Sequence, residues 1–377
     1  MSTRRRSAPS AFGFPVPASP ASLDGVVNVH DFEPIARERL DARAYGYFAS
    51  GAGDERSVAD NLAAWRRWRL LPTVLTGARD PDTSVSLLGT AAALPFGIAP
   101  TALQGMAHPD GEIAMARAAA AAGVPFVLST ASTRSLEEVA ASAGTGGSGP
   151  RWFQLYVEPD MGFARELVER AEAAGYGAIV LTVDLPVAGY RERDLRTRFA
   201  IPASVQAHVP AGRDASEETF MAYIDRKPEL RWADVATVAN WTSLPLVVKG
   251  ILAPRDVERA IDHGARAVWL SNHGGRQLDG AVTAAEMLPE AVEAARGRAE
   301  LYVDGGVRRG SDLLVALALG ARAAFLGRPF LYALAAAGEV GVAHAIAVLA
   351  EELRRGLTIL GATGVGDLRP SHVRVAT

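Results

Sequence analysis

The chain has 377 residues, of which 49% are hydrophobic and 21% are charged, a composition typical of a globular protein with a large core. Its 39 basic and 42 acidic residues give a net charge of −3, so no basic surface is predicted for a nucleic acid or an anionic membrane. Cysteine is absent, which excludes disulfides, thiolate nucleophiles and cysteine metal ligands, and no metal site is predicted.

Residues 1–27 are predicted to form a flexible tail. They contain consecutive arginines followed by scattered prolines, without the apolar segment that a signal peptide needs. The most apolar stretch, residues 313–338, is interrupted by two arginines and a proline, so it lacks the roughly 20 continuous apolar residues of a membrane helix. We therefore expect a soluble, cytoplasmic protein without membrane contact, in which residues 28–377 form a single domain.

Short β-type runs recur from residue 94 onward, and nearly all of them precede an alanine-rich amphipathic stretch. This alternation is typical of parallel β/α units, and eight units in about 250 residues fit an α/β fold of the (β/α)8 TIM-barrel type. The predicted strands are 94–100, 125–130, 152–157, 178–184, 244–250, 267–272, 301–304 and 323–327. Capping and first-turn residues predict helix starts near Asp110, Ser135, Asp160, Pro254, Thr283 and Ser311.

A doubly wound parallel sheet would show the same alternation, so the number of strands does not separate the two folds. The strand ends favour the barrel, because barrel enzymes build their sites from the carboxyl ends of many strands. Polar side chains stand at or just after these ends: Thr101, Ser129, Gln154, Tyr156, Thr182, Asp184, Lys249, Ser271, His273, Asp304 and Arg328.

Two segments lie outside this repeat. Residues 30–90 precede the barrel and predict an N-terminal helical extension, in which Tyr45, Tyr47 and Phe48 come before a glycine-rich loop. Residues 186–231, between the fourth and fifth strands, are too long and too polar for an ordinary connection. We expect this second segment to be an active-site loop or lid.

A phosphate site is predicted after the last two strands. Asp304 to Gly310 reads DGGVRRG, and Gly327-Arg328-Pro329 follows the eighth strand. Glycines let backbone N–H groups approach an anion, and arginine supplies a planar fork of donors. The alternative is a pair of ordinary turns with surface arginines. Neither a P-loop nor a dinucleotide-binding glycine motif is present, so the phosphate would belong to a cofactor bound by the barrel.

Catalytic groups are predicted after the sixth and fourth strands. His273 and Arg276 lie in the run SNHGGRQ, where an imidazole can abstract a proton and a guanidinium can bind a carboxylate. Asp184 could fix the tautomer of His273, and Arg191 could bind the same carboxylate. For Asp184 and Arg191, a solvated run of charges is the equal alternative.

Lys249 ends the fifth strand, in an otherwise apolar run, and is one of two lysines among the 39 basic residues. Such a cation is a Schiff-base nucleophile, an ion-pair partner or the stabiliser of a negative charge on a cofactor. The other lysine, Lys227, lies in the polar connection, so rarity alone does not decide between these roles.

The runs IAPTA, FQLYV, LTVD, SNHGGRQ, DGGVRRG and LGRP, in this order and spacing, resemble those of the FMN-dependent 2-hydroxy-acid oxidase and dehydrogenase family. This family includes glycolate oxidase, lactate oxidase and mandelate dehydrogenase. The resemblance covers about residues 28–372, and several motifs at successive strand ends are more specific than any one of them.

The resemblance implies FMN in the barrel mouth. Pro100, Thr101 and Ala102 would lie against the isoalloxazine, and the polar edge of the ring would bond Ser129, Gln154, Thr182 and Lys249. Lys249 would neutralise the negative charge of the reduced ring. The ribityl chain and phosphate would be bound by Ser271, Asp304, Gly306, Arg308, Gly327 and Arg328.

The resemblance also implies an L-2-hydroxy acid as substrate. Arg191, Arg276 and Tyr47 would bind its carboxylate, Tyr156 its 2-hydroxyl, and His273, oriented by Asp184, would be the catalytic base. Removal of the hydroxyl proton with hydride transfer and removal of the Cα proton to give a carbanion both use these residues. The sequence does not separate these two routes.

Departures from the family pattern concern the substrate and the electron acceptor. Glycolate oxidase has tryptophan where this chain has Ala131, and the space gained suits a bulkier side chain, as in mandelate dehydrogenase. The run 187–194 also resembles that enzyme, but its apolar membrane insertion is missing, and Ala102 resembles the oxidases. We therefore expect O2 to be the acceptor, giving H2O2. A dehydrogenase with another acceptor and a lactate monooxygenase are the alternatives, and the family resemblance implies a homotetramer.

Two other classes of function compete with this one. A Schiff-base lyase would use Lys249 on the same barrel. A non-catalytic FMN-binding protein would keep the fold, but it would not need a base together with two arginines for a carboxylate. A 2-hydroxy-acid oxidase uses both.

Overall fold

The computed structural model describes residues 21–142, 149–157, 160–200, 206–208 and 229–376. Most of the predicted tail, residues 1–20, lies outside this description. The end of the predicted tail packs on the domain, where Val26 is buried and its carbonyl oxygen lies 2.8 Å from Nε2 of His344.

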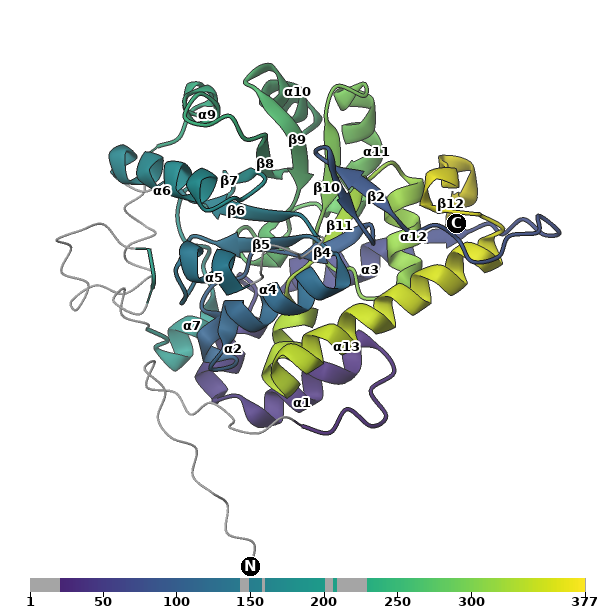
Figure 1. The fold of residues 1–377 in the computed structure, drawn as a ribbon, viewed down its shortest axis with the longest axis horizontal. Coiled ribbons are helices and arrows are strands. Elements are labelled where there is room, and N and C mark those ends of the chain that lie inside the picture. Colours follow the sequence, from purple (N-terminus) through teal and green to yellow (C-terminus); the bar gives the residue numbers. More distant parts are fainter. Residues whose placement is uncertain (1–20, 143–148, 158–159, 201–205, 209–228, 377) are drawn as a thin grey trace, which may run out of the picture.

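Eight parallel strands form a closed barrel, which confirms the (β/α)8 prediction over the doubly wound sheet (Figure 1). They pair in chain order, and the last strand closes on the first. The strands are β4 (Phe96–Ile98), β5 (Phe126–Ser129), β6 (Arg151–Leu155), β7 (Ile179–Thr182), β8 (Leu246–Ile251), β9 (Ala265–Leu270), β10 (Glu300–Val303) and β11 (Ala323–Leu326). Each lies in or overlaps one of the predicted runs.

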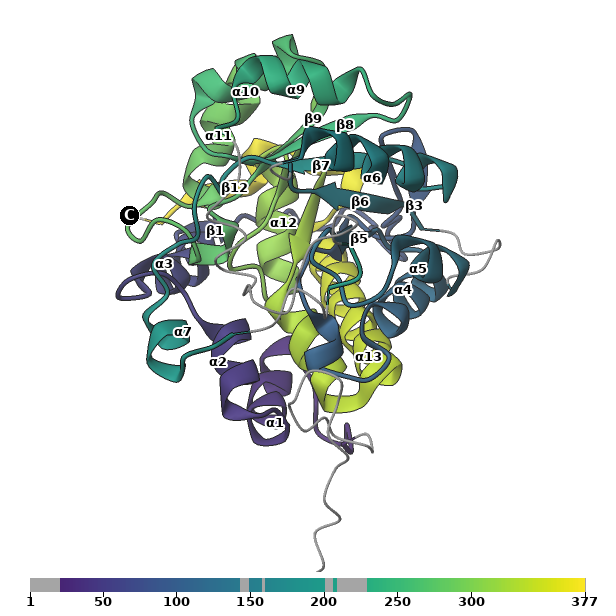
Figure 2. The same cartoon turned by 90° about the vertical axis from the view of Figure 1, so that its left-hand side faces the viewer.

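Helices surround the barrel, and the six whose starts were predicted begin within one residue of those positions (Figure 2). Asp160 accepts hydrogen bonds from the first backbone N–H groups of α6, and Thr283 forms a capping box with Glu286, which satisfies donors that a helix start leaves free. The outer helices are α4 (Gly111–Ala122), α5 (Leu136–Ser142), α6 (Met161–Ala173), α9 (Trp232–Ala239), α10 (Pro254–Asp262), α11 (Ala284–Ala295), α12 (Gly310–Ala318) and α13 (Arg328–Leu360).

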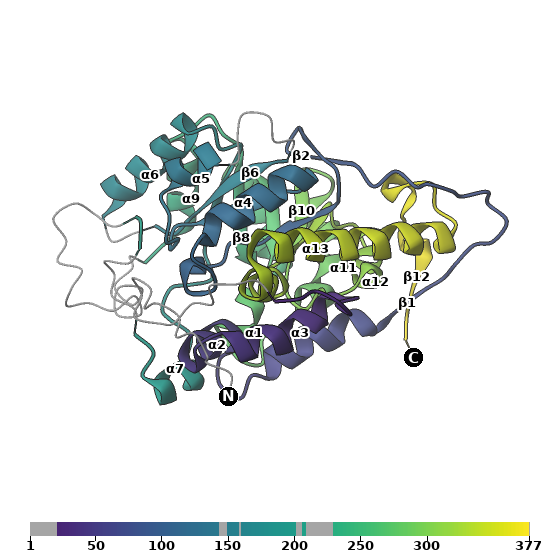
Figure 3. The same ribbon diagram turned by 60° about the horizontal axis from the view of Figure 1, so that its bottom comes forward.

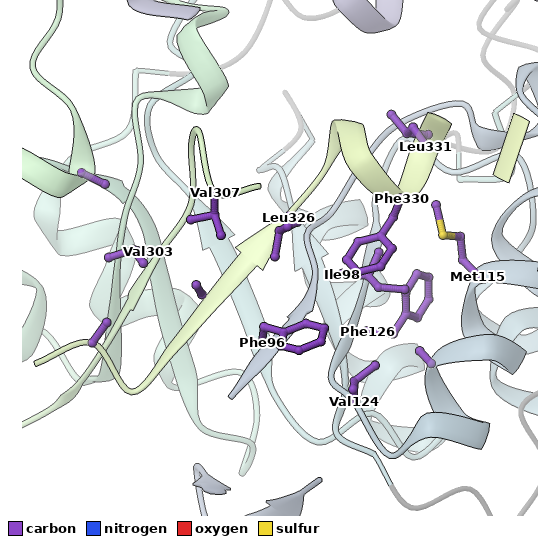
Figure 4. Close-up of a cluster of buried hydrophobic side chains, with 14 of the residues drawn as sticks. Phe96, Ile98, Met115, Val124, Phe126, Val303, Val307, Leu326, Phe330 and Leu331 are labelled. Carbon is purple, nitrogen blue, oxygen red and sulfur yellow. The ribbon is translucent and has the colours of Figure 1, made fainter. Parts of the chain in front are cut away.

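The hydrophobic core has two layers. Inside the barrel, Trp152, Trp269 and Phe325 pack on one another, and the hairpin of β2 (Val85–Leu87) and β3 (Thr90–Ala92) adds Leu87 to this layer. Between strands and helices, alternate strand residues face outward, as Figure 4 shows for Phe96, Ile98 and Phe126 beside Phe330 of α13. With its interior filled, the barrel offers its carboxyl end as the place for a site.

The apolar stretch 313–338 is divided between α12 and the first part of α13. In the described part of the chain, α13 is the one helix whose length and hydropathy match those of a membrane span. However, 67% of its most apolar window is buried inside the molecule, and its helical geometry breaks at Ala337 and Gly338. It packs on α1, α4 and α12 (Figure 3), as a core helix does.

The N-terminal extension is helical, as predicted, and contains α1 (Phe32–Arg39), α2 (Ala42–Ala49) and α3 (Arg56–Arg66). A short antiparallel pair that the sequence did not predict, β1 (Trp68–Leu70) with β12 (Val373–Val375), joins its end to the C-terminal segment.

In the long connection 186–231, α7 (Glu192–Thr197) lies beside α2. Residues 206–208 contact the loop after β5. Residues 201–205 and 209–228 of the predicted lid lie outside the described residues. Single 3-10 turns are η1 (Val29–Asp31), η2 (Gln104–Met106), η4 (His273–Gly275), η5 (Val365–Asp367) and η6 (Pro370–His372).

Candidate active site

A cavity of about 1100 Å3, including the part open to solvent, lies at the carboxyl ends of the strands. It is lined by residues from the loops after most of the barrel strands and by Tyr47 and Phe48 of α2. All but three of the predicted site residues line it. The exceptions, Gln154, Asp184 and Ser271, lie behind its wall and bond lining residues: Ser129, His273 and Lys249, respectively.

The predicted base and its carboxylate are in contact. Nδ1 of His273 lies 2.9 Å from Oδ1 of Asp184, and Nε2 lies 3.4 Å from the hydroxyl of Tyr156. Burial acts to raise the pKa of Asp184, but His273 and then Lys249 more than offset it, so the pKa lies below its usual value. Asp184 is therefore ionised at neutral pH and can stabilise a protonated His273.

Two arginines and a tyrosine form the opposite wall. The guanidinium carbons of Arg276 and Arg191 lie 4.9 and 5.7 Å from the centre of the Tyr47 ring. Arg276 is anchored through Nη1 to the carbonyl oxygens of Tyr47 and Ser50. Burial, followed by the charge of Arg191, lowers the pKa of Arg276 to about 10, so the pair attracts an anion such as a carboxylate.

Arg191 is a residue of this wall and not part of a solvated run. It is 6% exposed and lies 3.4 Å from Asp194, whose side chain is equally buried. Burial raises the pKa of Asp194, although Arg191 and Arg276 act in the opposite direction. The prediction of a solvated run holds for the neighbours Arg193 and Arg196, which form surface ion pairs.

Lys249 is an ion-pair partner, one of the three predicted roles. Its Nζ lies 3.1 Å from Asp304 and donates to Oγ of Ser271 at 2.9 Å. Ser271 in turn donates to Asp304 and accepts a hydrogen bond from the backbone N–H of His273. A buried, paired ammonium is a fixed positive charge at the cavity wall, and in this form it is not a nucleophile.

The predicted phosphate site contains two half-buried cations, Arg308 and Arg328. Among the described residues, Arg328 donates to the carbonyl oxygens of Phe48, Gly274 and Ser50. Within the described residues, neither Arg328 nor Arg308 forms a salt bridge with a carboxylate. Burial, with the charge of Arg328, lowers the pKa of Arg308 to about 10. Two desolvated cations beside a glycine loop fit a phosphate.

Two polar groups, one on the cavity wall and one just behind it, lack a hydrogen-bond partner among the described residues. Nε2 of Gln154 and Oγ1 of Thr182 are buried, and neither has a hydrogen-bond partner among the described residues. Buried polar groups are nearly always bonded, so these two fit the polar edge of a ligand. With Pro100, Thr101 and Ala102 on the adjacent wall, the donor set matches a flat heterocycle at one end and a phosphate at the other, as in FMN.

Sequence reasoning missed the residues of the N-terminal extension that support the cavity. Asn61 and Trp65 of α3 bond the loops after β9 and β10, and Ser50 accepts hydrogen bonds from Arg276 and Arg328. They lie more than 200 positions before the loops that they support, and no strand end or motif marks them. The only signal was the glycine-rich loop that begins at Ser50.

Comparison with known proteins agrees with this geometry. A family model described as FMN-dependent dehydrogenase matches residues 36–375. L-lactate oxidase of Nostoc sp. is 42% identical over 94% of this chain and 100% of its own length. The 4-hydroxymandelate oxidase of Amycolatopsis orientalis is 45% identical, over 93% of this chain and 98% of its own. The crystal structure of mandelate oxidase with (S)-4-hydroxymandelic acid is 43% identical, with a TM-score of 0.88 over 93% of this chain and 99% of that one. This chain therefore belongs to the FMN-dependent 2-hydroxy-acid oxidase family and is an FMN-containing oxidoreductase.

Proposed function

We propose that this protein oxidises an L-2-hydroxy acid with a bulky apolar side chain to the 2-oxo acid, with O2 as the electron acceptor and H2O2 as the second product. The observation that carries the proposal is one cavity in which the His273–Asp184 pair and Tyr156 face Arg191 and Arg276. A base, a hydroxyl partner and two cations are what a 2-hydroxy carboxylate needs.

The residues have separate tasks in this reaction. Arg276 and Arg191, with Tyr47, bind the carboxylate and so fix the orientation of Cα. Tyr156 bonds the 2-hydroxyl, and Nε2 of His273 receives the proton. Asp184 lies on Nδ1 of the same ring, where its negative charge stabilises the imidazolium.

The cofactor completes the electron balance. FMN, when bound, would supply a two-electron acceptor for the oxidation of the hydroxy acid, which O2 and two protons would regenerate with release of H2O2. Gln154, Thr182 and Lys249 would bond the polar edge of the ring. Arg308 and Arg328 would hold the phosphate. The fixed charge of Lys249 stabilises electron density at that edge.

A small apolar cluster supports the choice of substrate. Ala131 and Leu185 are buried, and Ala102, Tyr156 and Ala188 pack against them. Ala102, Leu185 and Tyr156 of this cluster line the cavity, and such an apolar wall of small residues favours a large apolar group, such as an aryl ring, which gains from leaving water. Two similar proteins, the 4-hydroxymandelate oxidase and the crystallised mandelate oxidase, are named for aryl 2-hydroxy acids.

Oxygen uptake with a panel of acids tests the proposal. The panel contains glycolate, L-lactate, (S)-mandelate and (S)-4-hydroxymandelate, with D-lactate and (R)-mandelate as enantiomeric controls. We expect the highest kcat/KM for the aryl acids of S configuration, with one 2-oxo acid and one H2O2 per O2. Reduction of an added dye without O2 uptake would indicate a dehydrogenase. Release of CO2 and water would indicate a monooxygenase. No turnover of any acid would contradict the substrate class.

A further inference from the structure

We propose that Asn61, on the N-terminal extension, is a positioning residue that holds the catalytic histidine and the phosphate loop of the cofactor in register with each other. The base half of this proposal rests on the proposed function of His273. Asn61 lies in the middle of α3 and is 3% exposed. It does not itself line the cavity, and it acts through two loops of the barrel.

The first contact is with the loop that carries the base. The side chains of Asn61 and Asn272 form a reciprocal amide pair, with both N···O distances at 2.9 Å. Asn272 immediately precedes His273, and its Oδ1 also accepts a hydrogen bond from the backbone N–H of Gly275. Asn272 thus joins the two ends of the short loop that contains His273, and the amide pair with Asn61 fixes the side chain of Asn272.

The backbone of this loop requires such support. His273 has φ of 59°, and Gly274 and Gly275 have φ of 67° and 78°, so three successive residues are left-handed. For a residue with a side chain this conformation is unfavourable. Such a backbone conformation persists where neighbouring groups fix it. Here Oγ of Ser271 accepts a hydrogen bond from the N–H of His273, and Oδ1 of Asn272 accepts one from the N–H of Gly275.

The second contact is with the phosphate loop. A Cβ atom at Gly306 would lie 1.8 Å from the backbone oxygen of Asn61, and one at Gly305 would lie 3.1 Å from its Oδ1. One turn further along α3, Nε1 of Trp65 donates to the carbonyl oxygen of Gly305 at 2.8 Å. The same face of α3 therefore supports both loops, and Asn61 is the residue that contacts both.

Three variants separate these tasks. Asn61→Ala removes the amide pair while favouring helix α3, because alanine has the higher helix propensity. Asn61→Leu also removes the pair but keeps most of the side-chain volume. Trp65→Phe removes the bond to Gly305, together with part of a buried ring, and leaves the Asn61–Asn272 pair in place. The control is Asn28→Ala, which removes the N-cap of η1 but leaves the Asn61–Asn272 pair and the Trp65 bond in place.

The measurements are the rate of flavin reduction under anaerobic conditions as a function of pH, and the FMN dissociation constant of the apoproteins from flavin fluorescence. We expect Asn61→Ala and Asn61→Leu to reduce the rate about tenfold, to shift its pH profile, and to weaken FMN binding several-fold. Trp65→Phe should weaken FMN binding alone. Asn28→Ala should change neither quantity.

A double-mutant cycle tests the route through Asn272. If Asn61 acts through the amide pair, Asn61→Ala combined with Asn272→Ala should be little slower than Asn272→Ala alone, because neighbouring groups that act together are not additive. Rates that multiply would overturn this route. Asn61 variants with the wild-type rate, pH profile and FMN affinity would overturn the whole proposal.

The result for the wild type keeps the two proposals distinguishable. If no 2-hydroxy acid reduces the wild-type flavin, the proposed function fails and the base half of this inference fails with it. The cofactor half is then decided by the FMN titrations alone, in which equal dissociation constants for wild type, Asn61→Ala and Trp65→Phe would overturn it.

Discussion

His273 combines a strained backbone with two side-chain contacts, to Asp184 on one ring nitrogen and Tyr156 on the other. Replacement with glutamine keeps a polar side chain but removes the basic nitrogen. We predict that His273→Gln slows flavin reduction by about 10²- to 10⁴-fold, the range of general base catalysis, while FMN stays bound.

Stopped-flow absorbance at the flavin band measures both properties. His263→Gln is the matched control, because His263 lies at the end of α10 and bonds the carbonyl of Arg259. Rapid reduction in His273→Gln would show that another group takes the proton.

Arg276 is anchored to the N-terminal extension and also lines the cavity. Among the described residues, its hydrogen bonds run from Nη1 to Tyr47 and Ser50. Lysine offers a point charge instead of a planar fork. We predict that Arg276→Lys raises KM by about 10- to 100-fold, the value of one charge-assisted pair, with a smaller change in kcat. An unchanged KM in steady-state assays would remove Arg276 from carboxylate binding.

The site residues that could be predicted from the sequence are those that stand at the ends of strands. Lys249, His273 and Arg328 stand where a barrel places functional groups, so motif and position agree. Asn61 and Trp65 lie on a helix whose partner surfaces are more than 200 residues away in sequence. Their importance arises only from packing, which no local pattern encodes.

Among the elements, the long connection after β7 is fixed to the barrel at His208. Leu136 donates its N–H to Nε2 of His208 at 3.0 Å, and Nδ1 lies 3.0 Å from the carbonyl oxygen of Thr130. This pattern requires a neutral ring, and burial lowers the pKa of His208 to about 4. The residue therefore joins the described part of the connection to the loop that carries Ala131.

The lowered pKa of His208 makes the free energy of unfolding depend on pH. The unfolded chain protonates His208 near pH 6.5 and the folded chain only near pH 4, so falling pH favours unfolding between these values. The contribution of His208 is complete above about pH 6.5 and is lost toward pH 4, in total about 3 kcal/mol. We predict that His208→Gln, followed by urea unfolding from pH 7 to pH 4, loses less stability than wild type. Parallel curves would contradict this.

The contact between α3 and the loop after β10 permits no side chain at Gly306. Its φ of +83° is left-handed, and a Cβ would meet the backbone of Asn61. Gly297 has φ of +70° with nothing within 4 Å of a Cβ in the described structure. We predict that Gly306→Ala lowers Tm and weakens FMN binding by more than tenfold. Gly297→Ala should show only the backbone effect of about 1 kcal/mol. Equal effects would mean that the loop adapts.

Element prediction succeeded where the pattern repeats. Eight β/α units produce the same signal eight times, and the caps at Asp160 and Thr283 mark helix starts. The pairs β1–β12 and β2–β3 were not predicted because each strand has three residues, too few for an alternation to be visible. The partner of β1, in addition, lies about 300 residues away at the end of the chain.

On the scale of the whole molecule, closure of the barrel brings eight strand ends to one cavity. The N-terminal extension then covers part of this mouth, and Ser50 and Tyr47 anchor arginines that come from the far end of the chain. We expect the resulting site to bind FMN, an aryl or other bulky L-2-hydroxy acid, and O2. The homotetramer implied by the family resemblance remains a prediction.

The measurement that tests the central claim most directly is the visible spectrum of the purified protein, recorded without oxygen before and after addition of (S)-mandelate. We predict a flavin spectrum that bleaches at once with (S)-mandelate, stays unchanged with (R)-mandelate, and returns when air is admitted. A flavin spectrum that no L-2-hydroxy acid bleaches would contradict the proposed substrate class. A protein that stays colourless after incubation with FMN would contradict the cofactor site itself.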